Sequence, residues 1–192
     1  MKRIGLFGGT FDPPHLGHLL IAQEALTAVK LDEVWFVPVS TPPHKERAGL
    51  TSGKDRYDMV KAALVQEGRF RVCDIELIRK GKSYTIDTVR ELKQTYPDDE
   101  FFFLIGGDMV DMLPEWRGID ELKQLVTFVA FNRPGASAKS QPDVHFVPFV
   151  EVNISSSLIR ERLAKGKPIR YFVTPAVEQL IEERNLYGDN NE

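Results

Sequence analysis

Short apolar runs alternate with segments of helical periodicity along most of the chain. Strand-like runs are predicted at residues 2–7, 33–39, 70–78, 100–105, 126–131 and 144–147. Helices are predicted at about 15–29, 52–67, 86–96, 155–165 and 175–185, with a short one between residues 107 and 126. This alternation predicts an α/β protein with a doubly wound, mostly parallel sheet and helices on both faces.

Hydroxyl and glycine residues mark the expected element ends. Ser52 and Thr85 each precede a helical pattern and are predicted as N-caps. Parallel sheets bind ligands beyond the carboxyl ends of their strands. Three conspicuous segments fall at such ends: Gly8-Gly9, Pro42-Pro43-His44-Lys45 and Gly106-Gly107-Asp108. The sequence therefore predicts a ligand site at that edge of the sheet.

Length and composition fit one soluble unit. The 192 residues predict a single domain over 1–192, with a C-terminal helical part at about 153–188. A net charge of −3 and a pI near 5.9 predict neither a nucleic-acid partner nor binding to acidic membranes. The single cysteine, Cys73, and the lack of a signal peptide or membrane span favour the cytoplasm. The oligomeric state stays open, a homo-oligomer included.

The most informative stretch runs from Gly8 to His18, directly behind the first strand. It predicts a glycine turn and a helix start with two histidines, His15 and His18, three positions apart. A helix N-terminus attracts anions through its unpaired N–H groups and its dipole, and two imidazoles on its first turn add donors. The stretch is therefore typical of a phosphate site.

Other interpretations of this stretch remain open from its residues alone. The glycines match neither the G-x-G-x-x-G dinucleotide pattern nor the Walker motif, and Gly8-Gly9 alone is consistent with a tight turn. His15 and His18 are also compatible with structural histidines or with zinc, for which Asp12 is the available third ligand.

Two motifs together resemble a known superfamily. The core of the first, His15-Leu16-Gly17-His18, resembles the T/S-x-G-H or H-x-G-H signature of the nucleotidyltransferases that include adenylyl- and cytidylyltransferases. Residues 154–160, Ile-Ser-Ser-Ser-Leu-Ile-Arg, resemble the second signature, I-S-S-T-x-I-R, with Ser157 replacing the threonine. The motifs lie about 140 residues apart in the expected order. The resemblance implies a Rossmann-like nucleotidyltransferase fold.

Over essentially its whole length the chain is similar to the bacterial nicotinate mononucleotide adenylyltransferase family. The similar segments are Pro42-Pro43-His44-Lys45, Ser83-Tyr84-Thr85, Ile105-Gly106-Gly107-Asp108, Trp116 and Arg133-Pro134-Gly135. The resemblance implies an enzyme that joins ATP to nicotinate mononucleotide, giving deamido-NAD and pyrophosphate. Mg²⁺ is expected with ATP, carried on phosphate oxygens and water, and no residue is assigned to hold it.

The resemblance and the residue chemistry assign an ATP side. His15, His18 and Arg160 are expected to be catalytic through contacts with the phosphates. The expected ATP-binding residues are Gly8, Gly9, Thr10, Phe11, Lys45, Gly106, Asp108, Ile154, Ser155 and Ser156. Among these, Ser155 is also compatible with an ordinary N-cap, Lys45 with a solvated loop lysine, and Asp108 with a helix N-cap.

Three residues are assigned to nicotinate mononucleotide. Trp116 is expected to stack on the pyridine ring. Thr85, at a predicted helix N-terminus, favours the nicotinate carboxylate through backbone N–H groups, and the resemblance places Arg117 beside it. A packing role for Trp116 and a solvent-facing Arg117 are the alternatives.

Two rival functions follow from the same residues. One is an adenylyltransferase with another acceptor, such as phosphopantetheine or nicotinamide mononucleotide. The other is a nucleotide-binding sensor without turnover, for which loss of a phosphate-handling group is expected; His15, His18, Lys45 and Arg160 are all present.

Overall fold

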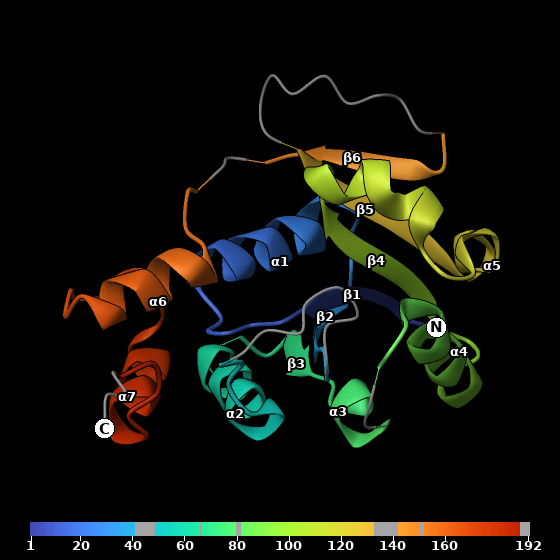
Figure 1. Cartoon of the computed structure of the whole chain (residues 1–192). Helices are drawn as coiled ribbons and strands as arrows, with labels where there is room; N and C mark the ends of the chain where they lie inside the picture. Colours follow the sequence, from blue (N-terminus) through green and yellow to red (C-terminus); the bar gives the residue numbers. More distant parts are fainter. Residues whose placement is uncertain (41–48, 66, 80–81, 133–141, 150–151, 189–192) are drawn as a thin grey trace.

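The computed structural model describes residues 1–40, 49–65, 67–79, 82–132, 142–149 and 152–188. Within them a six-stranded sheet has the order β3-β2-β1-β4-β5-β6, and every neighbouring pair of strands is parallel (Figure 1). The strands are β1 Arg3–Gly9, β2 Glu33–Pro38, β3 Phe70–Val72, β4 Glu100–Gly106, β5 Val126–Asn132 and β6 Val144–Pro148. The expected doubly wound α/β fold is confirmed, with a sheet that is parallel throughout.

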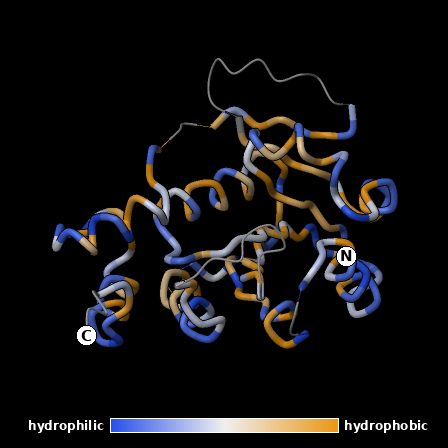
Figure 2. The backbone as a smooth tube through the Cα atoms, in the orientation of Figure 1, coloured by the Kyte–Doolittle hydropathy of each residue, from blue (hydrophilic) through white to orange (hydrophobic). Residues whose placement is uncertain are grey.

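The strands at the centre are buried on both faces, which explains their continuous apolar sequences. In β4 the side chains of Phe101 and Phe103 enter one core, and those of Phe102 and Leu104 enter the other. In Figure 2 the hydrophobic colouring gathers on the strands, while the outer surfaces of the helices are mostly hydrophilic. Because successive side chains of a strand point to opposite faces of the sheet, one apolar run contributes to both cores.

Helices cover the two faces in an order set by the crossovers. Helices α1 (Leu16–Ala28) and α2 (Gly53–Ala63) pack in the core that contains Phe102. On the opposite face lie α4 (Thr85–Thr95), the 3₁₀ helix η1 (Gly107–Glu115) and α5 (Ile119–Leu125). After β1 the chain therefore continues into α1 on one face of the sheet. After the neighbouring strand β4 it continues into η1 and α5 on the other face. Such a switch point is where doubly wound sheets form their ligand crevice.

The C-terminal helices form a further layer against α2. Helices α6 (Ser156–Ala164) and α7 (Pro175–Glu183) share a third apolar cluster with Met59 of α2, to which Ile159 and Val177 belong. Figure 1 shows α6 and α7 together at one end of the molecule, with α7 beside α2. Arg184, just after α7, bonds Asp55 at 2.6 Å and Asp58 at 2.8 Å. The second sequence motif is thereby attached to the sheet through α2.

Three boundary predictions need correction. The strand predicted at 70–78 ends at Val72, and Ile75–Arg79 forms the short helix α3. Apolar side chains at Ile75 and Leu77 imitate strand alternation, but Glu76 between them is buried and Ile78 is 70% exposed. The second helix ends at Ala63 rather than near residue 67.

The predicted cap at Thr85 is also wrong. Tyr84 is the N-cap of α4 and makes no side-chain capping bond, so Thr85 is the first helical residue. Ser52 does cap α2, because its hydroxyl accepts the Asp55 N–H at 3.1 Å. In the described part of the chain, every helix is too short or too polar to cross a membrane.

Candidate active site at the carboxyl ends of β1 and β4

Close packing shapes the glycine turn after β1. A Cβ on Gly9 would lie 2.8 Å from the ring of Phe11, so that position has no room for a side chain. Phe11 adopts a left-handed backbone conformation with φ of +50°, and its side chain is 1% exposed. Its ring meets that of His18 edge to face, with centroids 5.0 Å apart. The buried ring of Phe11 therefore supports the His18 ring, and the Phe11 side chain is not accessible to a ligand.

The two histidines begin α1 as a stacked pair. His15 is the N-cap, and its ring lies 3.6 Å from that of His18, centroid to centroid. The backbone N–H of His15 donates to Nδ1 of His18 at 3.1 Å. Because Nδ1 accepts, a neutral His18 carries its proton on Nε2. His15 Nδ1 is buried without a partner among the described residues, which leaves Nε2 as its ligand-facing nitrogen.

Burial keeps both imidazoles neutral. It lowers the pKa of His15 from 6.5 to about 4. Burial, and to a smaller extent the neighbouring His15, lower the pKa of His18 well below its ordinary value. Two imidazolium rings in a stack would repel each other and lose hydration. At neutral pH the free protein therefore presents two neutral N–H donors.

Gly17 leaves room for the ring of His15 at the start of α1, beside the second motif. A Cβ at position 17 would lie 3.0 Å from His15 Nδ1 and 3.8 Å from the Ile154 carbonyl. The Leu16 N–H donates to the Phe172 carbonyl at 2.9 Å. This bond occupies one of the N–H groups that a helix start offers to an anion. This N–H group is therefore not free to contact an anion.

The second motif is hydrogen-bonded to the first. Ser156 Oγ donates to the Pro13 carbonyl at 2.8 Å, and Arg160 donates to the Asp12 carbonyl. Ser155 caps α6, since its hydroxyl accepts the Leu158 N–H at 3.1 Å. The structure thus brings His15, His18, Ile154, Ser155, Ser156 and Arg160 to one place beyond β1.

Sequence reasoning missed Tyr187 and Arg56 beneath this site, and it considered Asp12 only as a zinc ligand. Asp12 is 1% exposed, and its Oδ1 accepts from the Tyr187 hydroxyl at 2.6 Å. Burial, followed by the Asp12 carboxylate, raises the pKa of Tyr187. Arg56 is also 1% exposed and lies on α2. A signal existed for Arg56, because it shares the apolar stripe 56, 59, 60 and 63 of that helix. No local pattern marks Tyr187.

The end of β4 supplies the next predicted residues. A Cβ on Gly106 would lie 2.6 Å from Asp108 Oδ1, so the carboxylate folds back over the glycine. Gly106 is the N-cap of η1 and Asp108 is within it, which makes the N-cap interpretation of Asp108 wrong. Asp108 is exposed. It stands at the mouth of the switch point with its carboxylate available to a ligand.

The residues assigned to nicotinate mononucleotide lie beyond the carboxyl end of β4, at the start of α4 and directly after η1. Arg117 is exposed and its guanidinium lies 4.7 Å from the ring centre of Tyr84, the N-cap of α4. Trp116 is half-buried and meets Phe103 edge to face at 5.7 Å. Phe103 also lies 3.5 Å from where a Cβ of Gly8 would be. One phenyl ring therefore separates the glycine turn from Trp116.

A buried polar network fixes the segment before Thr85. Arg79 donates to Ser83 Oγ at 2.6 Å and to Thr88 Oγ1 at 3.0 Å, and Thr88 donates to Glu76 at 2.8 Å. Burial raises the pKa of Glu76, against the opposing effect of the Thr88 bond. The start of α4 is consequently held from its own helix and from α3.

The described residues contain no cluster of three His, Cys, Asp or Glu side chains arranged for a metal ion. Asp12 Oδ2 has no hydrogen-bond partner among them, but it is sealed from solvent, and Oδ1 is already bonded to Tyr187. The predicted ATP-binding residue Lys45 lies outside the described residues.

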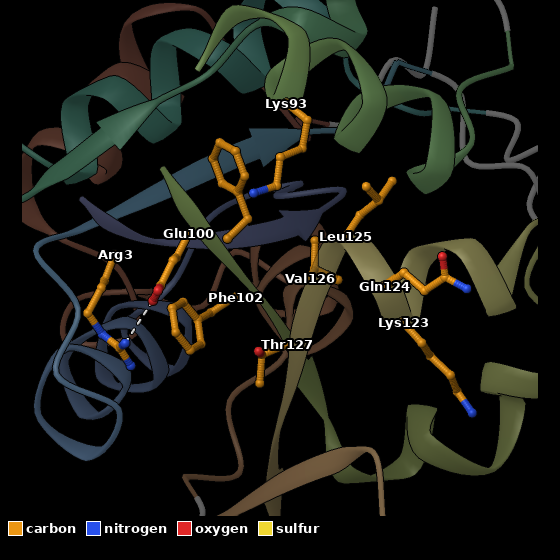
Figure 3. A pocket seen from close by; sticks show the side chains of 10 residues that line it. Arg3, Lys93, Glu100, Phe102, Lys123, Gln124, Leu125, Val126 and Thr127 are labelled. Carbon is orange, nitrogen blue, oxygen red and sulfur yellow. Dashed lines mark hydrogen bonds and ion pairs between the residues drawn. The ribbon is translucent and has the colours of Figure 1, made fainter. Parts of the chain in front are cut away.

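A recess of about 430 Å³ lies at the opposite edge of the sheet, where the strands begin (Figure 3). Its cations already have partners: Arg3 bonds Glu100 at 2.8 Å, Lys93 bonds the Asp99 carbonyl at 2.7 Å, and Lys123 bonds Asp143 at 2.9 Å. None of the predicted site residues lines it. The carboxyl edge remains the better candidate.

Comparisons with known proteins agree with this geometry. The cytidylyltransferase-like family model matches residues 6–162. The chain is 99% identical to a probable nicotinate-nucleotide adenylyltransferase of Shouchella clausii over the full length of both. It is 58% identical to one of Halalkalibacterium halodurans, covering 99% of this chain and 93% of that protein.

Solved structures give the same fold. Nicotinic acid mononucleotide adenylyltransferase from Plasmodium falciparum, complexed with APC, superposes with a TM-score of 0.78 at 21% identity. The match covers 97% of this chain and 98% of that one. The same enzyme complexed with NaAD also gives a TM-score of 0.78, at 20% identity.

The lowered pKa of His15 predicts that the folded protein loses stability in acid, and that this loss begins at a higher pH than the titration of ordinary carboxylates. Between pH 6.5 and about 4 the unfolded chain binds a proton at His15 that the folded protein does not. We therefore expect the free energy of unfolding to fall as pH drops through this window, by about 3 kcal/mol from His15. Urea denaturation from pH 7 to 4.5 measures this. His15→Asn should reduce the slope, whereas His145→Asn, at an exposed position, should not. An unchanged slope in His15→Asn would contradict the assignment.

Proposed function

The chain belongs to the cytidylyltransferase-like family, and we propose that it transfers the adenylyl group of ATP to nicotinate mononucleotide. The products are nicotinate adenine dinucleotide (deamido-NAD) and pyrophosphate, and the reaction serves NAD biosynthesis. Two bacterial relatives that bear the name of this activity match over 100% and 93% of their own length. The protein is thus a nicotinate-nucleotide adenylyltransferase in this proposal.

One observation carries the proposal: the two distant motifs form a single site. Bonds from Ser156 to Pro13 and from Arg160 to Asp12 join the second motif to the loop between β1 and α1. The imidazoles and a guanidinium therefore lie beyond β1, and an aromatic side chain and the start of α4 lie beyond its neighbour β4. This division suits a triphosphate and a pyridine nucleotide.

The chemistry requires no protein nucleophile. The phosphate of a mononucleotide has a second pKa near 6, so it is largely a dianion at neutral pH. One of its oxygens bonds to the α-phosphorus of ATP, and the bond from that phosphorus to the bridging oxygen breaks. The electron pair leaves with pyrophosphate. The protein's contribution is to hold two polyanions in line and to stabilise charge as it shifts.

Each ATP-side residue has a distinct task in this proposal. His18 Nε2–H donates to the α-phosphate oxygens, and His15 contacts the phosphates beside it. Arg160 and the α6 start at Ser155 and Ser156 hold the β- and γ-phosphates. Asp108, exposed above Gly106, accepts from ribose hydroxyls. The remaining contacts come from backbone at Gly8, Gly9, Thr10, Phe11 and Ile154.

The nicotinate side selects an acid. The N-terminus of α4 begins at Thr85, and Arg117 lies over Tyr84 directly before it. A helix N-terminus and a guanidinium both favour a carboxylate over a neutral carboxamide. Trp116 offers its indole for stacking on the pyridine ring while its packing on Phe103 fixes its position.

Mg²⁺ enters this proposal as part of the substrate. The described side chains provide no resident metal cluster, and Mg²⁺ prefers phosphate oxygens and water. When bound, the ion neutralises charge on the triphosphate and the departing pyrophosphate. Lys45 is assigned to the same phosphates on its sequence position alone. The use of ATP as a substrate and the single cysteine favour a cytoplasmic location for the enzyme, which cell fractionation tests.

A paired assay tests the function. Purified protein with ATP, MgCl₂ and either nicotinate or nicotinamide mononucleotide should release pyrophosphate. We expect kcat/KM for the acid to exceed that for the amide by at least about tenfold, equivalent to about 1.4 kcal/mol. EDTA should stop turnover without lowering the melting temperature of the nucleotide-free protein. No turnover with either mononucleotide would refute the function, and equal use of both would refute only the carboxylate selection.

Removing the proposed transition-state donor should lower kcat. His18→Ala deletes the Nε2–H group, and loss of such a donor costs at least about a hundredfold in kcat. Steady-state kinetics with saturating ATP measure the effect, and the melting temperature checks folding. His145→Ala removes an exposed histidine on β6 and should leave kcat unchanged. Near-normal turnover of a folded His18→Ala protein would remove His18 from this role.

Replacing the indole should affect one substrate. Trp116→Ala is expected to raise KM for nicotinate mononucleotide by about tenfold, while KM for ATP changes little. Because Trp116 also packs on Phe103 and Phe128, Trp116→Phe serves as the variant that retains an apolar ring. It should show a smaller rise in the same KM. Equal increases for both substrates would contradict stacking on nicotinate.

A further inference from the structure

Arg56 is a fully buried arginine that makes four hydrogen bonds, each to a backbone carbonyl. Its Nε donates to Thr51 at 3.0 Å, and Nη1 donates to Thr10 at 2.9 Å and to Val39 at 2.7 Å. Nη2 donates to Ser40 at 3.0 Å. The four carbonyls belong to three segments: the loop after β1, the exit from β2 and the residue before the cap of α2.

Burying a charged guanidinium at this position costs desolvation free energy. Burial lowers the pKa of Arg56, and the Asp12 carboxylate opposes that shift. The neighbouring positions on the stripe, Met59, Val60 and Ala63, are apolar and pack in the cores of α2. Apolar residues often replace buried charged groups without loss of stability. The arginine therefore does something that packing alone does not require.

Its bonds converge on the nucleotide end of the proposed site. Thr10 directly follows the glycine turn, and its carbonyl is held by Arg56, while the carbonyl of Asp12, two residues later, is held by Arg160. The two guanidinium groups thus fix the same short turn from α2 and from α6. Val39 and Ser40 tie the carboxyl end of β2 to that turn. A planar fork fixes directions that a point charge does not.

We propose that Arg56 is a positioning residue for ATP: its guanidinium sets the course of the turn from Gly8 to Asp12 relative to the exit from β2. The inference rests on the proposed adenylyl transfer and adds a residue to it. Arg56 touches no substrate, because its side chain is sealed beneath the turn. It acts through the Thr10 and Val39 carbonyls on the backbone that meets the phosphates.

Two variants distinguish the planar geometry of the Arg56 guanidinium from its positive charge. Arg56→Lys keeps a cation but not the planar fork, and Arg56→Gln keeps a short donor without charge. We expect kcat/KM for ATP to fall by about a hundredfold in both, the size of effect that small misplacement produces. KM for nicotinate mononucleotide should stay within about twofold of the unsubstituted value. The dissociation constant of a non-hydrolysable ATP analogue, measured by calorimetry, should rise by about tenfold.

Val60→Ala is the matched control. Val60 is fully buried on the same helix but makes no polar contact with the turn, so this variant lowers the melting temperature alone. Arg56→Lys with unchanged ATP affinity would overturn the proposal. So would an equal loss of ATP affinity in Val60→Ala.

A measurement on the unsubstituted protein keeps the test valid if the Arg56 variants do not fold. The Arg56 Nε–H should exchange slowly with solvent in ¹⁵N-labelled protein, and bound ATP analogue should slow it by about tenfold or more. Identical exchange rates with and without analogue would overturn the proposal. Analogue binding needs no acceptor, so a failure to use nicotinate mononucleotide would count against the proposed function and not against Arg56.

Discussion

The site depends on the bonds that Ser156 and Arg160 make to the carbonyls of Pro13 and Asp12. These residues are separated by more than 140 positions, and no local preference brings them together. The first motif has its donors on neutral rings, whereas the second carries a permanent cation. Neither has the means to handle a triphosphate alone. Packing of α6 and α7 on α2 holds the second motif where these bonds form.

Charge and hydrogen bonding are divided between the motifs. The stacked imidazoles are neutral because burial favours the uncharged form of both. A neutral Nε2–H donor follows a shifting negative charge without adding an imidazolium that must itself be solvated. In the proposed reaction, the positive charge that the neutral imidazoles lack comes from Arg160 and from the ion that accompanies ATP.

The sequence predicted what is encoded locally. Strand β4 was predictable because both its faces are buried and its run of apolar residues is unbroken. The spacing of His15 and His18 was sufficient to place both rings on the first turn of α1. The prediction was wrong where local patterns compete. Ile75 and Leu77 alternate as in a strand but lie in a short helix. Thr85 is a residue type typical of an N-cap, but the N-cap of α4 is Tyr84. The contact between Asp12 and Tyr187 lay beyond prediction because its partners are 175 positions apart.

The bond from Tyr187 to Asp12 has a consequence for biosynthesis. Ribosomes make the glycine turn early and position 187 much later, so the turn emerges without the hydroxyl, the guanidinium and the carbonyl that later hold it. At bacterial translation speeds the delay is roughly ten to thirty seconds. During this delay the carboxylate of Asp12 lacks its hydrogen bond from Tyr187. Arg160, Phe172 and Tyr187 therefore reach the turn and the start of α1 only after all six strands of the sheet have been synthesised.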